Sequence, residues 1–186
     1  MIKIKRVISH QELAEFIQFY YDLYRGNDNA VPYLYADEKN TLRRDKNPSF
    51  ECCEAEYFLA QKDGKTVGRV AAIINHRANE RWNRRQVRFG WFDFIDDPEV
   101  SSALLKAVED WGRQKGMTEI AGPLGFIDTD REGMLVEGFD DNWFDTKGEF
   151  LSLQAAAPVW KLLHHEDLAV LLRSPWPLQG CLWNPR

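Results

Sequence analysis

The sequence has few cysteines, no long apolar run and no excess of basic charge. Of the three cysteines, Cys52 and Cys53 are adjacent, and this spacing fits neither a disulfide framework nor a zinc site. No segment approaches the ~18 uncharged apolar residues that a membrane span needs, and the N-terminus lacks the apolar core of a signal peptide. We therefore expect a reduced, cytoplasmic protein with no metal site and no membrane partner.

The charge balance also disfavours a nucleic-acid partner. The 24 basic residues are outnumbered by 29 acidic ones, giving a net charge of -5. A local cluster, Arg77, Arg81, Arg84, Arg85 and Arg88 with Trp82 among them, could still bind phosphates or single-stranded nucleic acid. The alternative is a solvated connection that nearby acids such as Glu80 balance, and we favour it.

The first quarter of the chain predicts a strand followed by a helix. Apolar and basic residues alternate over 2–8, and Ser9 with Glu12 forms a capping box before apolar residues at helical spacing. Gly26 ends this pattern, so we expect the helix over about 10–25. Residues 27–50 are loop-rich, with one short helix near 37–44.

The middle of the chain predicts a hairpin and then a strand–helix–strand unit. Strands at 56–61 and 66–75 flank an Asp-Gly turn signal, and a polar linker at 78–85 leads to a third strand at 87–94. Gly90 within that strand indicates a bulge or a close backbone approach. A helix with the N-cap Asp97 then leads to a short buried strand at 118–122, which we expect to pair parallel to the third strand.

This order of elements resembles the opening of the GNAT acyltransferase fold. Residues 57–74 are similar to the central hairpin of that family, and 87–122 to the strand–helix–strand that cradles coenzyme A. Residues 122–140 are similar to a segment of uncharacterised bacterial GNAT-like proteins. The resemblance implies an α/β fold over 1–140, with a mixed sheet and helices on both faces.

The resemblance also implies transfer of an acyl group from acetyl-CoA or another acyl-CoA to a small-molecule or peptide amine. It places the thioester against the backbone of Phe92 and Phe94, and the cofactor against Ser101 and Ser102 at the start of the following helix. Asp93 and His76 are the candidate bases. If Val87, Phe89 and Trp91 face the core, Asp93 shares that side of the strand, where burial would raise its pKa and suit it to take a proton from the amine.

Two departures from the family pattern leave other functions open. The glycine-rich phosphate loop is replaced by residues 96–101, where three acids and Pro98 favour helix capping over pyrophosphate binding. No tyrosine follows Tyr57, so the family's usual general acid has no visible counterpart. The alternatives are a non-catalytic GNAT-like ligand-binding module and one half of a tandem GNAT-like protein.

The C-terminal residues 141–186 read as an atypical tail. They contain only four basic and five acidic residues but four of the seven tryptophans, and their pattern permits short helices broken by Pro158. We expect the C-terminal part of the GNAT-like fold to be missing or altered here, through a truncated, rearranged or out-of-frame tail. The sequence does not predict an oligomeric state.

Overall fold

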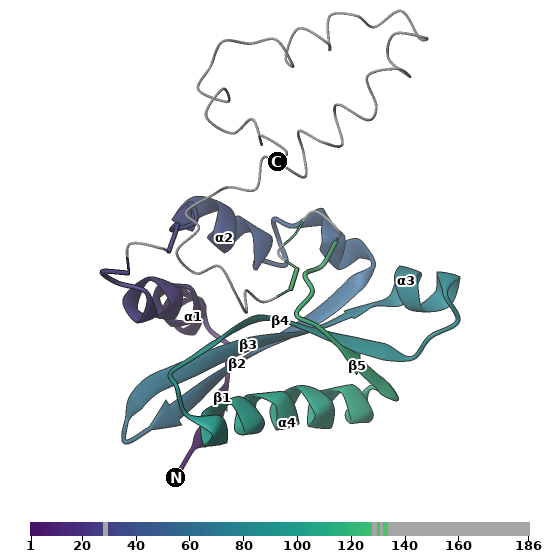
Figure 1. Cartoon of the computed structure of the whole chain (residues 1–186). Coiled ribbons are helices and arrows are strands. Elements are labelled where there is room, and N and C mark those ends of the chain that lie inside the picture. The colour runs from purple at the N-terminus through teal and green to yellow at the C-terminus, as the bar shows by residue number, and fades with distance from the viewer. Residues whose placement is uncertain (28–29, 128–129, 131, 134–186) are drawn as a thin grey trace, which may run out of the picture. The chain divides into compact units, whose positions relative to one another are not determined.

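The computed structural model describes residues 1–27, 30–127, 130, 132 and 133. The expected tail at 141–186 and the boundary near 140 lie outside these residues. The elements follow the predicted order (Figure 1), and their bounds are β1 (Lys3–Arg6), α1 (His10–Leu23), α2 (Tyr35–Thr41), a 3-10 helix (Pro48–Glu51), β2 (Cys53–Lys62), β3 (Lys65–Asn75), α3 (His76–Arg81), β4 (Gln86–Phe94), α4 (Pro98–Gln114) and β5 (Glu119–Ala121).

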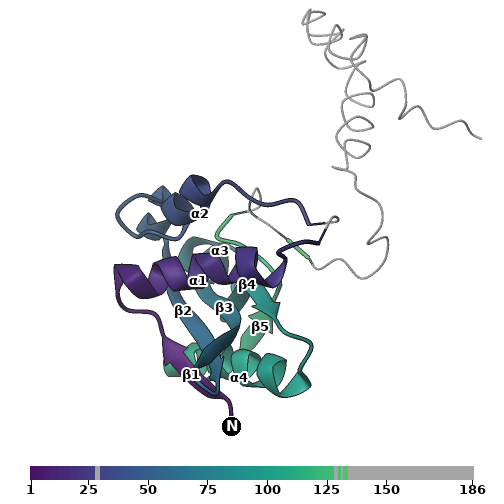
Figure 2. The ribbon, with the colours of Figure 1, turned by 90° about the vertical axis from the view of Figure 1, so that its left-hand side faces the viewer.

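The five strands form one mixed sheet in sequence order. Strands β1 to β4 pair antiparallel, and β5 pairs parallel to β4, as the strand–helix–strand pattern predicts. Helices α1 and α2 cover one face of the sheet and α4 covers the other (Figures 1 and 2). The described residues thus form an α/β fold with the GNAT-like mixed sheet and helices on both faces.

Each face of the sheet has its own apolar core, because successive side chains of a strand point to opposite faces. On the α1 side, Phe16 and Ile17 pack on alternate residues of β2 and β3 such as Leu59 and Ile73. On the α4 side, the core consists of Phe58, Ala60, Val70, Ala72, Ile74, Val87, Val100, Leu104, Val108 and Trp111. Central strands buried on both faces explain the nearly continuous apolar sequence of β3.

The predicted helix caps are confirmed. The backbone N–H of Glu12 donates to the Ser9 hydroxyl, and the Glu12 carboxylate accepts the N–H of Ser9, which completes the capping box of α1. Asp97 caps α4 by accepting the N–H of Glu99. These local contacts need only residues close in sequence, so the pattern alone predicts them.

Two local predictions were wrong. The expected linker at 78–85 contains part of the short helix α3, because the Asn75 side chain accepts the Ala78 N–H and caps a helical turn. The strand β5 is not buried: Glu119 and Ile120 are exposed, since β5 is the last strand of the described sheet. Within the described part of the chain, no helix is both long and apolar enough to span a membrane.

Candidate functional site

Strand β4 contains a bulge between Gly90 and Asp93. Gly90 pairs with Ala71 and Asp93 with Arg69, so two residues of β4 face the single residue Val70 of β3. The first of the two, Trp91, has a φ of 47°, in the left-handed region that a bulky side chain rarely adopts. Strained backbone of this kind is concentrated at functional sites, where the surrounding structure maintains it.

The bulge changes which face of the sheet the side chains reach. Val87 and Phe89 pack on the α4 side, whereas Trp91 belongs to the core on the α1 side. Asp93 also faces the α1 side, where its carboxylate contacts the hydroxyl of Tyr24. The expectation that all four share one side was therefore wrong, because the extra residue at the bulge reverses the alternation.

A buried carboxylate on α2 holds Trp91 in this conformation. The indole N–H of Trp91 donates to Glu38 Oε2 over 3.1 Å, and both residues are at most 9% exposed. The Trp91 ring also contacts Phe126, with ring centroids 5.8 Å apart. The bulge is thus anchored from α2 and from the segment after β5.

The outer edge of β4 is paired along only part of its length. The pairing with β5 ends at Arg88, and the next contact is a hydrogen bond from Leu124 N–H to the Phe89 carbonyl, 2.8 Å long. A Cβ on Gly90 would lie 2.5 Å from the Leu124 carbonyl oxygen, which confirms the predicted close backbone approach. Beyond Gly90 no strand among the described residues covers this edge of β4.

Asp93 lies in a polar group between β3, β4 and α1. Its Oδ2 accepts the Arg69 Nε–H over 2.7 Å and lies 2.7 Å from Arg69 Nη2, while Arg69 Nη1 donates to the Phe16 carbonyl. Arg69 is fully buried and stacks against the rings of Phe16 and Tyr20. A buried guanidinium of this kind needs a charged partner, and Asp93 supplies it.

The second oxygen of Asp93 faces a tyrosine. The Tyr24 hydroxyl lies 3.4 Å from Asp93 Oδ1. Burial, together with the neighbouring Asp93 carboxylate, raises the pKa of Tyr24, so the hydroxyl stays protonated at neutral pH. Tyr24, the C-cap residue of α1, therefore offers a proton donor that the search for a tyrosine after Tyr57 did not reveal.

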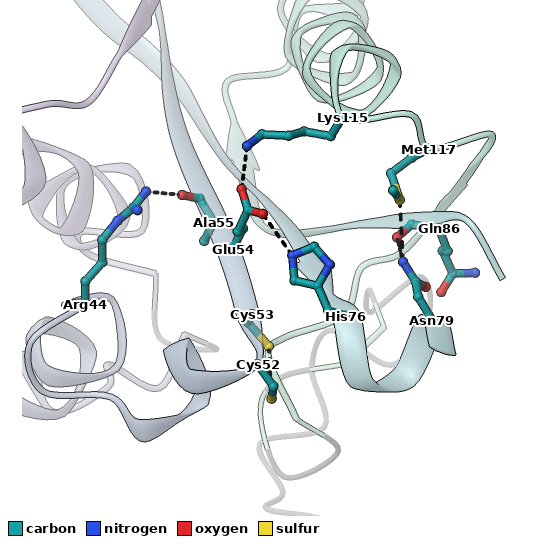
Figure 3. Close-up of polar contacts among 10 residues, drawn as sticks. All are labelled: Arg44, Cys52, Cys53, Glu54, Ala55, His76, Asn79, Gln86, Lys115 and Met117. Atoms are coloured by element: carbon teal, nitrogen blue, oxygen red, sulfur yellow. Dashed lines mark hydrogen bonds and ion pairs between the residues drawn. The ribbon is translucent and has the colours of Figure 1, made fainter. Parts of the chain in front are cut away.

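His76 lies far from this group. It follows Asn75, the last residue of β3, and Asn75 is six positions along the strand from Arg69, the partner of Asp93, which corresponds to about 20 Å. The His76 ring contacts Glu54 Oε1 at 2.9 Å, and Lys115 binds the other oxygen of Glu54 (Figure 3). His76 and Asp93 cannot both contact one reacting group.

The start of α4 does not fit a bound pyrophosphate. The Asp97 carboxylate accepts the Glu99 N–H and pairs with Lys62 over 2.8 Å, and the Lys62 hydrogen bond lowers the pKa of Asp97. The Ser101 hydroxyl donates to the Pro98 carbonyl, and Ser102 is exposed. The cofactor contact predicted at Ser101 and Ser102 stays a prediction. Exposed Asp96 and Glu99 would repel a phosphate placed directly at this helix start, so a bound coenzyme A would have to place its phosphates elsewhere.

Three of these residues were missed by the sequence interpretation. Glu38 lies in the polar helix α2 and looks like a surface residue, and Tyr24 lies in a run of tyrosines. Arg69 offered the one usable signal, because it interrupts an apolar strand and can be buried only beside an acid. Finding the acid requires the register of β3 and β4.

The described fold thus belongs to the class of α/β proteins with a GNAT-like mixed sheet. No family model matches the chain. It is 34% identical over 137 residues to Protein YghO of Escherichia coli (strain K12), covering 74% of this chain and 35% of that protein. It is also 34% identical over 130 residues to a protein named bacterial ceramide synthase from Caulobacter vibrioides, covering 69% of this chain and 34% of that one. The chain spans about a third of the length of these curated relatives.

Solved structures of acetyltransferases resemble the chain more distantly. A tandem GNAT protein from the clavulanic acid biosynthesis pathway has a TM-score of 0.49 at 13% identity, over 64% of this chain and 35% of that one. AAC(6')-Iy in complex with a CoA bisubstrate analogue has a TM-score of 0.43 at 21% identity, over 74% and 99% of the two chains.

Proposed function

We propose that this chain carries the site of an N-acyltransferase, which moves an acyl group from a coenzyme A thioester to an amine. The observation that carries the proposal is the anchored bulge of β4, whose outer edge lacks a covering strand beyond Gly90 in the described residues. Unpaired backbone N–H groups at such an edge can donate to a thioester carbonyl as negative charge develops on its oxygen. Phe92 and Phe94, in or next to the bulge, are the proposed contacts.

The proposed reaction uses the polar group beside the bulge. The amine nitrogen attacks the thioester carbon, the carbon–sulfur bond breaks, and Asp93 takes the proton that the amine loses. The departing thiolate takes a proton from the Tyr24 hydroxyl, and Tyr24 recovers it from Asp93, 3.4 Å away. Of the two candidate bases, Asp93 lies on β4 two residues beyond Trp91, so the proposal keeps Asp93 and gives His76 no role.

The relative named bacterial ceramide synthase supports a long-chain acceptor. A ceramide is an amide between a fatty acid and a long-chain amino alcohol, so its formation is an N-acylation. Apolar and aromatic side chains are exposed before and at the start of α2, at Val31, Tyr33, Leu34 and Tyr35. Tyr33 contacts the ring of Tyr20, one turn before Tyr24, so this surface continues from the Asp93 group. We propose that it contacts the alkyl chain of the amine.

The test is an assay of thiol release with a panel of donors and acceptors. Acetyl-CoA and palmitoyl-CoA are each combined with sphinganine, an aminoglycoside and a lysine peptide, and the amide product is identified by mass spectrometry. We expect turnover of the long-chain amine, a loss of at least about 100-fold in Asp93→Asn, and unchanged turnover in His76→Ala. Turnover that survives in Asp93→Asn but not in His76→Ala would contradict the assignment.

A non-catalytic binding module is the second candidate, and the start of α4 favours it. The Asp97 cap occupies the Glu99 N–H, which a pyrophosphate would need, and exposed Asp96 and Glu99 add repulsion. A module of this kind would bind an acyl-CoA or amine, detectable by calorimetry, without releasing thiol. The chain spans about a third of the length of its curated relatives. If the rest of a longer protein completes the site, this chain would also bind without releasing thiol. An assay of the longer protein for thiol release distinguishes that case from a binding module.

A further inference from the structure

The connection between β3 and β4 presents an exposed tryptophan among arginines. Trp82 is 67% exposed, whereas Trp91 and Trp111 are each 9% exposed. Arg77, Arg81, Arg84 and Arg85 are also exposed, and the Arg81 guanidinium lies 5.5 Å from the centre of the Trp82 ring. We call these five residues the arginine tip.

Among the described residues, no ion pair neutralises the charge of the arginine tip. None of its four arginines makes one within the residues that the structure describes. Elsewhere, ion pairs engage Lys5, Arg6, Arg25, Arg43, Lys62, Arg69, Lys106, Arg113 and Lys115. Among the acids near the tip, Glu54 pairs with His76 and Lys115 (Figure 3). Glu80 within the tip and Glu119, whose backbone N–H donates to the Arg85 carbonyl, are exposed.

Hydrogen bonds hold the arginine tip in one conformation. Asn75 caps α3, and the Asn79 side chain donates to the Gln86 carbonyl over 2.9 Å, which joins α3 to the start of β4 (Figure 3). The Arg84 N–H donates to the Asn79 carbonyl over 2.8 Å. Figure 1 shows α3 at the end of the sheet away from the β2–β3 turn. The exposure of Trp82 is therefore built into an ordered turn.

We propose that the arginine tip binds the surface of an anionic lipid bilayer. Arginines near such a surface are attracted to its negative charge, and a tryptophan between them is suited to the headgroup region. A single exposed ring on a projecting turn does not offer the row of stacking positions by which single-stranded nucleic acid is bound. The sequence expectation of no membrane partner was based on the lack of a spanning segment, and contact at the surface needs none.

Sedimentation with vesicles tests the proposal on the full chain. At about 0.1 M salt we expect binding to vesicles of phosphatidylcholine with about 30% phosphatidylglycerol, and little binding to phosphatidylcholine alone. Arg81→Gln should lower the partition coefficient about fivefold, and Arg81→Gln with Arg84→Gln about 25-fold, corresponding to about 1 kcal/mol per arginine. The matched control, Arg25→Gln with Arg113→Gln, changes the net charge equally and should alter binding less than twofold.

The position of Trp82 is tested separately by quenching with lipids that carry a spin label near the headgroup. Wild-type fluorescence should be quenched, and Trp82→Phe should lose most of that quenching while circular dichroism shows an intact fold. The proposal is overturned if wild type ignores anionic vesicles, or if the control pair weakens binding as much as the tip pair. It is also overturned if a single-stranded oligonucleotide binds the tip more tightly than vesicles. Vesicle binding does not depend on turnover, so its failure leaves the acyl-transfer proposal standing.

Discussion

Glu38→Ala is expected to loosen the bulge of β4, because it removes the acceptor of the Trp91 indole N–H. Both groups are buried, so the variant leaves a donor without a partner and costs about 2 kcal/mol of unfolding free energy. For a chain of this size that lowers the melting temperature by about 4–8 °C. Without its anchor, Trp91 should leave the strained conformation at a φ of 47°, and acetyl-CoA should bind at least about tenfold more weakly.

A matched control separates the loss of the anchor from a general loss of stability. Leu42→Ala empties a fully buried position at the C-cap of the same helix and costs about 2–5 kcal/mol, but it keeps the Glu38 acceptor of the Trp91 indole N–H. Glu38→Gln keeps an acceptor and should retain most of the affinity. Differential scanning fluorimetry and calorimetric titration of acetyl-CoA measure the two effects. Glu38 does not anchor the bulge if Leu42→Ala weakens acetyl-CoA binding as much as Glu38→Ala, or if Glu38→Ala melts within about 1 °C of wild type.

Substitutions at Gly90, Glu12 and Asp93 each perturb the contacts of a single residue. Gly90→Ala would put a Cβ 2.5 Å from the Leu124 carbonyl oxygen, so it should lower the free energy of unfolding in urea by about 1–3 kcal/mol. An unchanged urea midpoint would contradict the close approach. Backbone hydrogen bonds lower the pKa of Glu12 from 4.5 to about 2, so its contribution to stability is present above pH 4.5 and lost as the pH falls towards 2. The difference in unfolding free energy between wild type and Glu12→Gln should therefore shrink as the pH falls through that range. A difference in urea melts that stays constant with pH would contradict the prediction. Asp93→Asn leaves Arg69 buried without a charged partner and should cost about 3–5 kcal/mol, whereas a loss under about 1 kcal/mol would show that the pair is solvated.

The order of elements could be predicted because it depends on local patterns. Helical spacing of apolar residues and the caps at Ser9 and Asp97 locate α1 and α4, and the Asp-Gly turn locates the hairpin. The parallel pairing of β5 follows from the intervening helix. Gly90 indicated a local irregularity, and the structure places the irregularity and the close approach there.

The candidate site could not be predicted in the same way, because it depends on pairs far apart in sequence. Glu38 meets Trp91 across 53 residues, and Tyr24 meets Asp93 across 69. The bulge also reverses the alternation that had assigned Asp93 to the side of Val87. One inserted residue therefore changes the environment of every later side chain on β4, and no local pattern reveals which partners it then meets.

If the bulge of β4 binds an acyl-coenzyme A, acetyl-CoA must stabilise the full chain in a thermal melt. We expect a saturable rise in unfolding free energy that reaches about 2.7 kcal/mol at 100 times the dissociation constant and is smaller in Glu38→Ala at the same concentration. A cooperative melt that acetyl-CoA does not shift at any concentration would contradict it.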